Sequence, residues 1–212
     1  MIKVYIIEDQ LAIVLGLQSF LNQAECSCTV TGYSKSVKTA IGEIQNNPCD
    51  VMIMDLFIDR TDPLVHLRRI RTLLPDIPII VYSSESSLLW RWIVLKEGVM
   101  GFVTKNSEID ELVPVIHGAV KGEITVPQDL RNFFDKMNFT DGLNAINAED
   151  LDIIRFKDLG YKNTNIADIH HRSVKAIEKR LQNLCNKFDV ETVKDLNRLL
   201  VNPAVFGRKI YY

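Results

Sequence analysis

The sequence predicts an α/β domain followed by a small all-α domain, and three observations support this division. In residues 1–122, five short apolar runs alternate with five segments of helical periodicity. After residue 144, four helical patterns follow one another without a strand pattern between them. Residues 1–143 carry 13 Lys and Arg against 18 Asp and Glu, a net charge of −5, and residues 144–212 carry 12 against 9, a net charge of +3. The predicted linker is 123–144, and the second domain is 145–212.

The predicted strands are short, apolar and rich in β-branched residues. Val51–Met54 is almost purely apolar, which is typical of a strand that is covered on both faces. The five strands are Ile2–Ile7, Cys28–Tyr33, Val51–Met54, Ile79–Tyr82 and Gly101–Thr104. The helical segments that follow them are Leu11–Leu21, Ser36–Gln45, Leu64–Leu74, Leu88–Lys96 and Ile109–Val120. This alternation predicts a doubly wound, five-stranded parallel sheet with helices on both faces.

The C-terminal segment shows helix signals of a different kind. Asn147 is a plausible N-cap, and Ser173 is another. The four predicted helices run from Asn147 to about Leu159, over Asn165–Ile169, from Ser173 to about Phe188, and over Thr192–Leu200. Within the linker a short helix is expected near Leu130–Met137, and the tail Val201–Tyr212 is apolar without a clear period.

Composition excludes several classes of protein. Hydrophobic residues make up 47% and charged residues 25% of the chain, an ordinary globular balance. No apolar run approaches the roughly 20 residues that span a bilayer, and the N-terminus lacks a signal-peptide layout. We therefore expect a cytoplasmic protein that does not enter membranes. None of the four cysteines forms a CxxC pair, and no His lies at metal-ligand spacing from them, so they are expected to be reduced thiols. A redox or metal element at Cys26 and Cys28 is the less favoured alternative.

Polar residues stand where the predicted strands end. Glu8 and Asp9 follow the first strand, Asp55 ends the third, Ser83 the fourth and Lys105 the fifth. Because the carboxyl ends of parallel strands share one edge of the sheet, these residues should meet near the switch point of the strand order. Three carboxylates held close together favour Mg²⁺, which prefers oxygen ligands. A bound Mg²⁺ would let Asp55 act as a nucleophile toward a phosphoryl group, with Ser83 and Lys105 contacting its oxygens.

These segments resemble the receiver domain of two-component response regulators. The resemblance covers residues 1–122 and rests on Val4–Asp9, Val51–Leu56, Pro78–Ser84 and Gly98–Lys105. It implies a flavodoxin-like fold in which Asp55 accepts phosphate from a sensor histidine kinase, and in which Glu8 and Asp9 hold Mg²⁺ together with Asp55. It also implies that Ser83 and Phe102 are the switch pair. Phosphorylation would then be a local charge event that biases a bistable element.

The loop after Asp55 departs from the family pattern. The family carries Pro four residues on and Gly eight residues on, and here these positions are Asp59 and Pro63. Asp59 adds negative charge near the pocket, and Pro63 stiffens the loop. The departure motivates an alternative function, an orphan response regulator that binds DNA independently of phosphorylation or through a partner protein.

The third C-terminal helix has an apolar stripe that leaves a polar outer face. With Val174, Ile177 and Leu181 inward, the outer face carries Lys175, Glu178, Lys179 and Gln182. The order of residues in 145–201 resembles the NarL/LuxR-type helix-turn-helix, although His170-His171-Arg172 occupies a turn where Gly is common. The resemblance implies a dimer that binds double-stranded DNA with this helix in the major groove. Base contacts are expected from Glu178, Lys179 and Gln182, and phosphate contacts from Lys162, Asn163, Lys175, Arg180 and Lys187.

An enzyme is the less favoured hypothesis. A phosphohydrolase on a similar sheet needs a second acid two residues after the nucleophile, and that position is Phe57. Trp90 and Trp92 lie two residues apart on one predicted helix, so they cannot share a face, and at least one should be exposed or at an interface.

Overall fold

The computed structural model describes residues 1–59 and 61–201, which form two compact units. The first unit is Met1–Glu85 with Glu97–Pro127, and the second is Ser86–Lys96 with the described residues from Gln128 onward. Residues 202–212, which make up most of the apolar tail and the end of the predicted second domain, lie outside the described part.

Five parallel strands form one sheet in the first unit, in the order β2-β1-β3-β4-β5. The strands are β1 (Ile2–Ile7), β2 (Cys28–Ser34), β3 (Val51–Met54), β4 (Ile79–Ser83) and β5 (Gly101–Thr104). The chain runs outward from β1 to β2, returns to β3 on the other side of β1, and then proceeds to β5. The prediction of a doubly wound parallel sheet is confirmed, and its switch point lies between β1 and β3.

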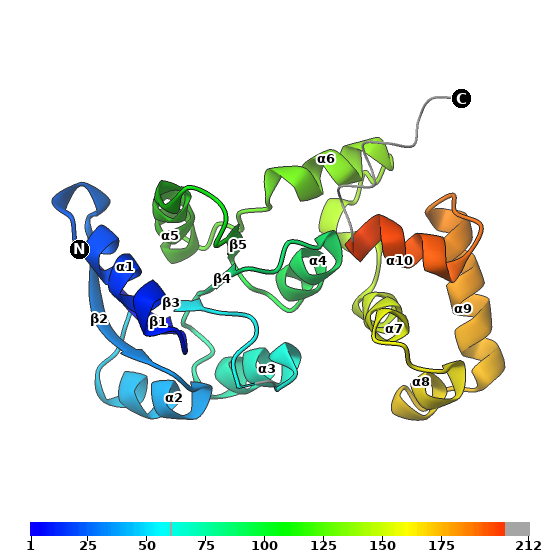
Figure 1. Ribbon diagram of the computed structural model, residues 1–212, viewed down its shortest axis with the longest axis horizontal. Coiled ribbons are helices and arrows are strands. Elements are labelled where there is room, and N and C mark those ends of the chain that lie inside the picture. The colour runs from blue at the N-terminus through cyan, green and yellow to red at the C-terminus, as the bar shows by residue number, and fades with distance from the viewer. Residues whose placement is uncertain (60, 202–212) are drawn as a thin grey trace. The chain divides into compact units, whose positions relative to one another are not determined.

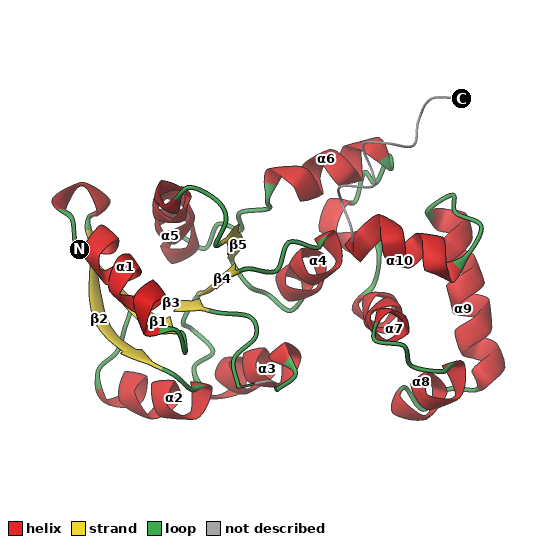
Figure 2. Ribbon diagram, in the orientation of Figure 1, coloured by secondary structure: helices red, strands yellow, loops and turns green. Residues whose placement is uncertain are grey.

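Helices cover both faces of this sheet. In Figures 1 and 2, α1 and α5 lie on one side of the strands, and α2 and α3 lie on the other. Their bounds are α1 (Leu11–Leu21), α2 (Val37–Asn46), α3 (Pro63–Leu73) and α5 (Leu112–Val120), with 3₁₀ turns η1 (Ala24–Cys26) and η2 (Ile109–Glu111). Alternate strand residues such as Val4, Ile6, Val51 and Ile53 pack with α1 and α5 in one hydrophobic core. All four residues of β3 are buried, as expected for a strand covered on both sides.

The second unit consists of helices only within its described residues. They are α4 (Leu88–Lys96), α6 (Gln128–Lys136), α7 (Ala148–Asp158), α8 (Asn163–Ile169), α9 (Val174–Lys187), α10 (Val193–Val201) and the 3₁₀ turn η3 (Gly142–Ala145). Both predicted N-caps are confirmed, since Asn147 Oδ1 accepts from Asp150 N and Ser173 Oγ accepts from Ala176 N. The predicted apolar stripe of α9 enters a core with α7 and α8 through Ile177 and Leu181.

Helix α4 belongs to the second unit by its contacts, although it lies between β4 and β5 in the sequence. It packs with α6, α7, α10 and η3. Seven of its nine residues are buried, which fits a helix that is apolar around most of its circumference. Trp92 is completely buried, and Trp90 is partly buried. Among the described residues, no helix is both long enough and apolar enough to cross a bilayer.

Candidate functional site

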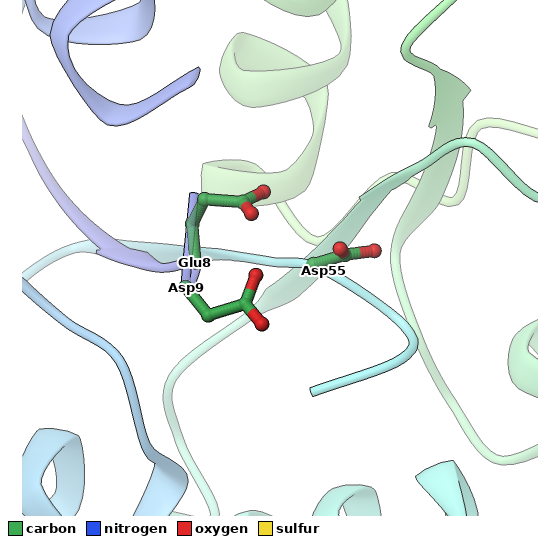
Figure 3. A group of neighbouring side chains, drawn as sticks. All are labelled: Glu8, Asp9 and Asp55. Atoms are coloured by element: carbon green, nitrogen blue, oxygen red, sulfur yellow. The ribbon is translucent and has the colours of Figure 1, made fainter. Parts of the chain in front are cut away.

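The pairing of β1 with β3 places the first acidic residues beside each other. Ile7 is opposite Met54 in the register, so Glu8 and Asp55 are the next residues along two neighbouring strands. The backbone continues this pairing, since Asp55 N donates to Ile7 O at 2.9 Å. Figure 3 shows the carboxylates of Glu8, Asp9 and Asp55 gathered at this edge. Ligand oxygens of all three lie within 4.8 Å of one another.

Lys105 brings a positive charge into the acidic pocket formed by these residues. Its Nζ lies 2.7 Å from Glu8 Oε2 and 2.8 Å from Asp55 Oδ2. The β4–β5 pairing sets its position, because Lys105 N donates to Ser83 O at 2.8 Å. Burial lowers the pKa of Lys105, but hydrogen bonds to Asp55 and Glu8 outweigh burial, so the pKa is raised and the ammonium stays charged. Burial raises the pKa of Glu8, and the hydrogen bond from Lys105 only partly offsets this.

One carboxylate oxygen of Asp55 lacks a hydrogen-bond partner within the described part of the chain. Asp55 is buried, and among the described residues nothing donates a hydrogen bond to its Oδ1. A buried carboxylate oxygen without a partner is costly, so it marks a place for a cation or another electrophile. Glu8, Asp9 and Asp55 supply the hard oxygen ligands that suit Mg²⁺, and the three residues fit this ion by their chemistry.

The two expected switch residues lie on the neighbouring strands. Ser83 is the last residue of β4 and is almost completely buried, and its Oγ accepts a hydrogen bond from Glu85 N at 3.4 Å. Phe102 is buried within β5. The structure therefore brings Glu8, Asp9, Asp55 and Lys105 into one pocket, with Ser83 joined to Lys105 through the backbone.

Asp59 and Pro63, the two loop residues that differ from the family pattern, have local structural roles. Asp59 adopts a left-handed backbone with φ of 53°, and its Oδ1 lies 3.0 Å from His66 Nε2 and accepts from Thr61 N. Hydrogen bonds from Thr61 and His66 lower the pKa of the Asp59 carboxyl. Pro63 is the first residue of α3, which starts one residue earlier than predicted because Asp62 caps it.

Helix α9 presents a polar face in the second unit. Lys175, Glu178, Lys179 and Gln182 are exposed on it, as the apolar stripe predicts. Gln182 also donates to Asn186 Oδ1 at 3.1 Å. At the start of α8, Lys162 is exposed, and the half-buried Asn163 accepts from Lys157 Nζ.

Arg180 and Lys187 do not extend freely from this face. Arg180 forms ion pairs with Glu149 Oε2 at 2.5 Å and with Asp150 Oδ1 at 3.0 Å, both at the start of α7. Lys187 donates to the carbonyl of Ala145. Sequence reasoning did not find the acidic partners on α7, because only the packing of α7 against α9 brings residues thirty positions apart together.

The turn between α8 and α9 is closed without glycine. His171 takes the left-handed conformation with φ of 51°, and Arg172 N donates to Ala167 O at 2.9 Å. His171 therefore adopts the backbone geometry for which Gly is the common residue.

The chain belongs to the response regulators, because residues 4–117 match the family of response regulator receiver domains. The response regulator protein VraR of Staphylococcus epidermidis is 25% identical over 194 residues, which cover 90% of this chain and 91% of VraR. VraR of Staphylococcus aureus is also 25% identical over 194 residues, with the same coverage of both chains.

Solved structures share the whole fold. RcsB from Salmonella enterica serovar Typhimurium, bound to the promoter rprA in the presence of the phosphomimetic BeF₃⁻, matches with a TM-score of 0.65 and 22% identity over 94% of this chain and 98% of that chain. A structure of two RcsB dimers bound to two parallel DNAs matches with a TM-score of 0.64 and 22% identity, over 93% of this chain and 96% of that chain.

Proposed function

We propose that this chain is a phosphorylation-controlled transcriptional regulator. Asp55 accepts a phosphoryl group from a sensor histidine kinase, and the modification changes dimerisation and the binding of double-stranded DNA. The observation that carries this proposal is the meeting of Glu8, Asp9, Asp55 and Lys105 in one pocket, with Asp55 Oδ1 left without a hydrogen-bond partner among the described residues.

The pocket supports phosphoryl transfer to Asp55. An Asp55 oxygen forms the bond to phosphorus while the bond from phosphorus to the donor nitrogen breaks, and its electron pair stays with the leaving imidazole. Lys105 lies close enough to Asp55 to contact the phosphoryl oxygens once they are attached, and Ser83 is the proposed hydroxyl donor. Mg²⁺ held by Glu8, Asp9 and Asp55 would supply positive charge against the incoming phosphoryl group.

The second unit supports DNA binding through α9. The proposed base contacts are Glu178, Lys179 and Gln182, and Lys162, Asn163 and Lys175 are the proposed phosphate contacts. We leave out Arg180 and Lys187, because their side chains are engaged within the unit. The RcsB structures of the same fold are bound to DNA, and one contains dimers, which supports a dimer on two half-sites. A cytoplasmic site of action is part of the proposal.

Labelling by acetyl phosphate tests the phosphorylation step. The full chain is incubated with acetyl phosphate with and without Mg²⁺, and its intact mass is measured beside Asp55→Asn and Asp76→Asn, a control in an exposed turn. We expect one phosphoryl group on the wild type and on Asp76→Asn only with Mg²⁺, and none on Asp55→Asn. Absence of labelling in the wild type would favour the orphan regulator, and equal labelling of Asp55→Asn would exclude Asp55 as the acceptor.

A further inference from the structure

Glu178 places a negative charge in the middle of the polar face of α9, the proposed recognition helix. The exposed residues of this face are Lys175, Glu178, Lys179 and Gln182. Glu178 comes three residues after Lys175 and four before Gln182, so these side chains follow one another along the same side of the helix. If this side enters the major groove, the carboxylate comes close to the phosphates of the duplex.

The carboxylate of Glu178 is not engaged within the protein. Among the residues that the structure describes, its side chain makes no hydrogen bond and no ion pair. The acids of α7 differ in this respect, because Glu149 Oε1 lies 3.2 Å from Arg172 Nε and Asp152 Oδ1 lies 2.6 Å from Arg155 Nη2. The second unit therefore pairs these acids with arginine and leaves the carboxylate of Glu178 available to a partner outside the chain.

The chemistry of a carboxylate limits which base it can contact. An ionised carboxylate accepts hydrogen bonds and donates none, and the phosphates of any duplex repel it. This repulsion is offset only where a base presents an N–H group to Glu178. In the major groove, guanine and thymine present acceptors without an amino group, so they offer no such donor.

Of the two bases with an amino group, cytosine fits a carboxylate better than adenine. Adenine presents the acceptor N7 beside its N6 amino group, and N7 would repel the second oxygen of Glu178. Cytosine presents N4–H₂, the group from which Glu and Asp accept in the major groove. An amide suits adenine instead, because it can donate to N7 and accept from N6 at the same time.

The lysines beside Glu178 have the opposite effect on affinity. Lys175 and Lys179 are exposed, and their ammonium groups attract DNA of any sequence. A face with two lysines and no acid would bind every duplex more tightly. The carboxylate between them lowers affinity for all sequences except those that offer it a donor, so it contributes to selectivity by rejection.

We propose that Glu178 is a specificity-determining residue that accepts a hydrogen bond from the N4 amino group of a cytosine in each half-site. The same carboxylate weakens binding to DNA that lacks a cytosine at this position. The inference rests on the proposed function, because it requires α9 to lie in the major groove.

Selection from a random duplex pool tests the assigned base. The full-length wild type, Glu178→Ala, Glu178→Gln and Glu191→Ala each select duplexes at fixed salt, with and without beryllofluoride and Mg²⁺. Glu191→Ala is the matched control, since it removes the same charge from an exposed position between α9 and α10. We expect the wild type and Glu191→Ala to enrich a C·G pair at one position of the half-site. Glu178→Ala should lose this preference, and Glu178→Gln should shift it toward adenine.

Fluorescence anisotropy then measures the discrimination on the duplex that the wild type selects. Replacing the selected C·G pair by T·A should weaken binding of the wild type about tenfold and that of Glu178→Ala about twofold or less. On a duplex without the selected sequence, Glu178→Ala should bind about threefold more tightly than the wild type at the same salt, and Glu191→Ala should bind as the wild type does.

Two results would overturn the role of Glu178 while DNA binding itself stands. In the first, Glu178→Ala keeps the wild-type preference at every position. In the second, the preference that it loses is for a base other than cytosine. If the wild type selects no duplex under either condition, the proposed DNA binding fails and the role of Glu178 falls with it.

Discussion

Lys105 determines the charge balance of the acidic pocket. Its ammonium contacts Glu8 and Asp55 at hydrogen-bond distance, and all three side chains are buried. Without this cation the two neighbouring carboxylates would repel each other. Lys105 therefore supplies part of the positive charge that a divalent ion at the same carboxylates would also supply. A modification of Asp55 is therefore expected to change which cations contact the carboxylates of the pocket.

Replacing Lys105 tests how far the stability of the protein depends on a cation in the acidic pocket. Lys105→Met leaves two buried carboxylates without their cation, so we expect the free energy of unfolding to fall by about 3 kcal/mol without Mg²⁺. Mg²⁺ should restore part of this loss in Lys105→Met and add less to the wild type, as measured by urea unfolding. Lys121→Met, which removes a lysine that follows α5 and is exposed, is the control. No dependence on Mg²⁺ in Lys105→Met would argue against a metal site at the three carboxylates.

The basic residues near α9 should separate into two groups in DNA binding. Lys175 is exposed, whereas Arg180 is paired with Glu149 and Asp150. Lys175→Ala should reduce the slope of log affinity against log salt by about 1, the effect of losing one phosphate contact. Arg180→Ala should leave this slope unchanged. Equal slopes for the two variants in a fluorescence anisotropy titration would contradict this assignment.

At the scale of the elements, a side-chain cap stabilises the first turn of α9, the helix that carries the polar face. Ser173 Oγ accepts from Ala176 N and so satisfies one of the free N–H groups of the first turn. Ser36 makes the same contact with Thr39 N at the start of α2, in the first unit. Both caps are serine hydroxyls that accept from the N–H three residues on, and Ser36 Oγ also lies 3.0 Å from Thr39 Oγ1. They belong to different units and so form a pair for comparison.

Removing either cap should lower the stability by a similar amount, but only removal of the α9 cap should weaken DNA binding. We expect Ser173→Ala and Ser36→Ala each to lower the free energy of unfolding by about 1 kcal/mol in urea titrations. Only Ser173→Ala should weaken DNA binding, because only that change frays the proposed recognition helix. A loss of DNA affinity in Ser36→Ala as large as in Ser173→Ala would show that overall stability, and not the helix start, accounts for the effect.

The contact between α7 and α9 should depend on pH. Hydrogen bonds from Arg180 and Arg172 hold the pKa of Glu149 below its usual value of 4.5. A carboxyl whose folded pKa is lowered adds stability above its unfolded pKa and loses it as the pH falls through the folded pKa. Glu149→Gln should therefore be less stable than the wild type by about 1 kcal/mol at neutral pH, with the difference vanishing at acidic pH. A difference that persists well below pH 4.5 would contradict this.

At the scale of the whole molecule, the site residues that could be predicted from the sequence are those that directly follow a strand. Glu8, Asp55 and Lys105 each follow a strand, and parallel strands bring such positions to one edge whatever the details of packing. The outer face of α9 was also predictable, because helical periodicity identifies the side that a helix buries.

The features that the sequence did not predict depend on which elements and side chains come into contact in the fold, and a sequence pattern does not specify those contacts. Helix α4 is recognisable as apolar, but periodicity does not say which helices cover it, and its contacts with α6 and η3 lie outside the predicted first domain. Arg180 illustrates the same limit, since a basic residue on a polar face can serve DNA or a neighbouring carboxylate. The acidic residues on α7 decide between these, and only the fold brings them near.

The central claim is that the state of Asp55 controls DNA binding, and one titration tests it most directly. A duplex is first selected from a random pool by the full chain, and its affinity is then measured by fluorescence anisotropy at fixed salt, with and without beryllofluoride and Mg²⁺, for the wild type and for Asp55→Asn. We predict that the wild type binds at least tenfold more tightly with beryllofluoride and that Asp55→Asn does not respond. Equal affinity of the wild type under both conditions would contradict control through Asp55 and would leave a regulator that binds DNA independently of phosphorylation.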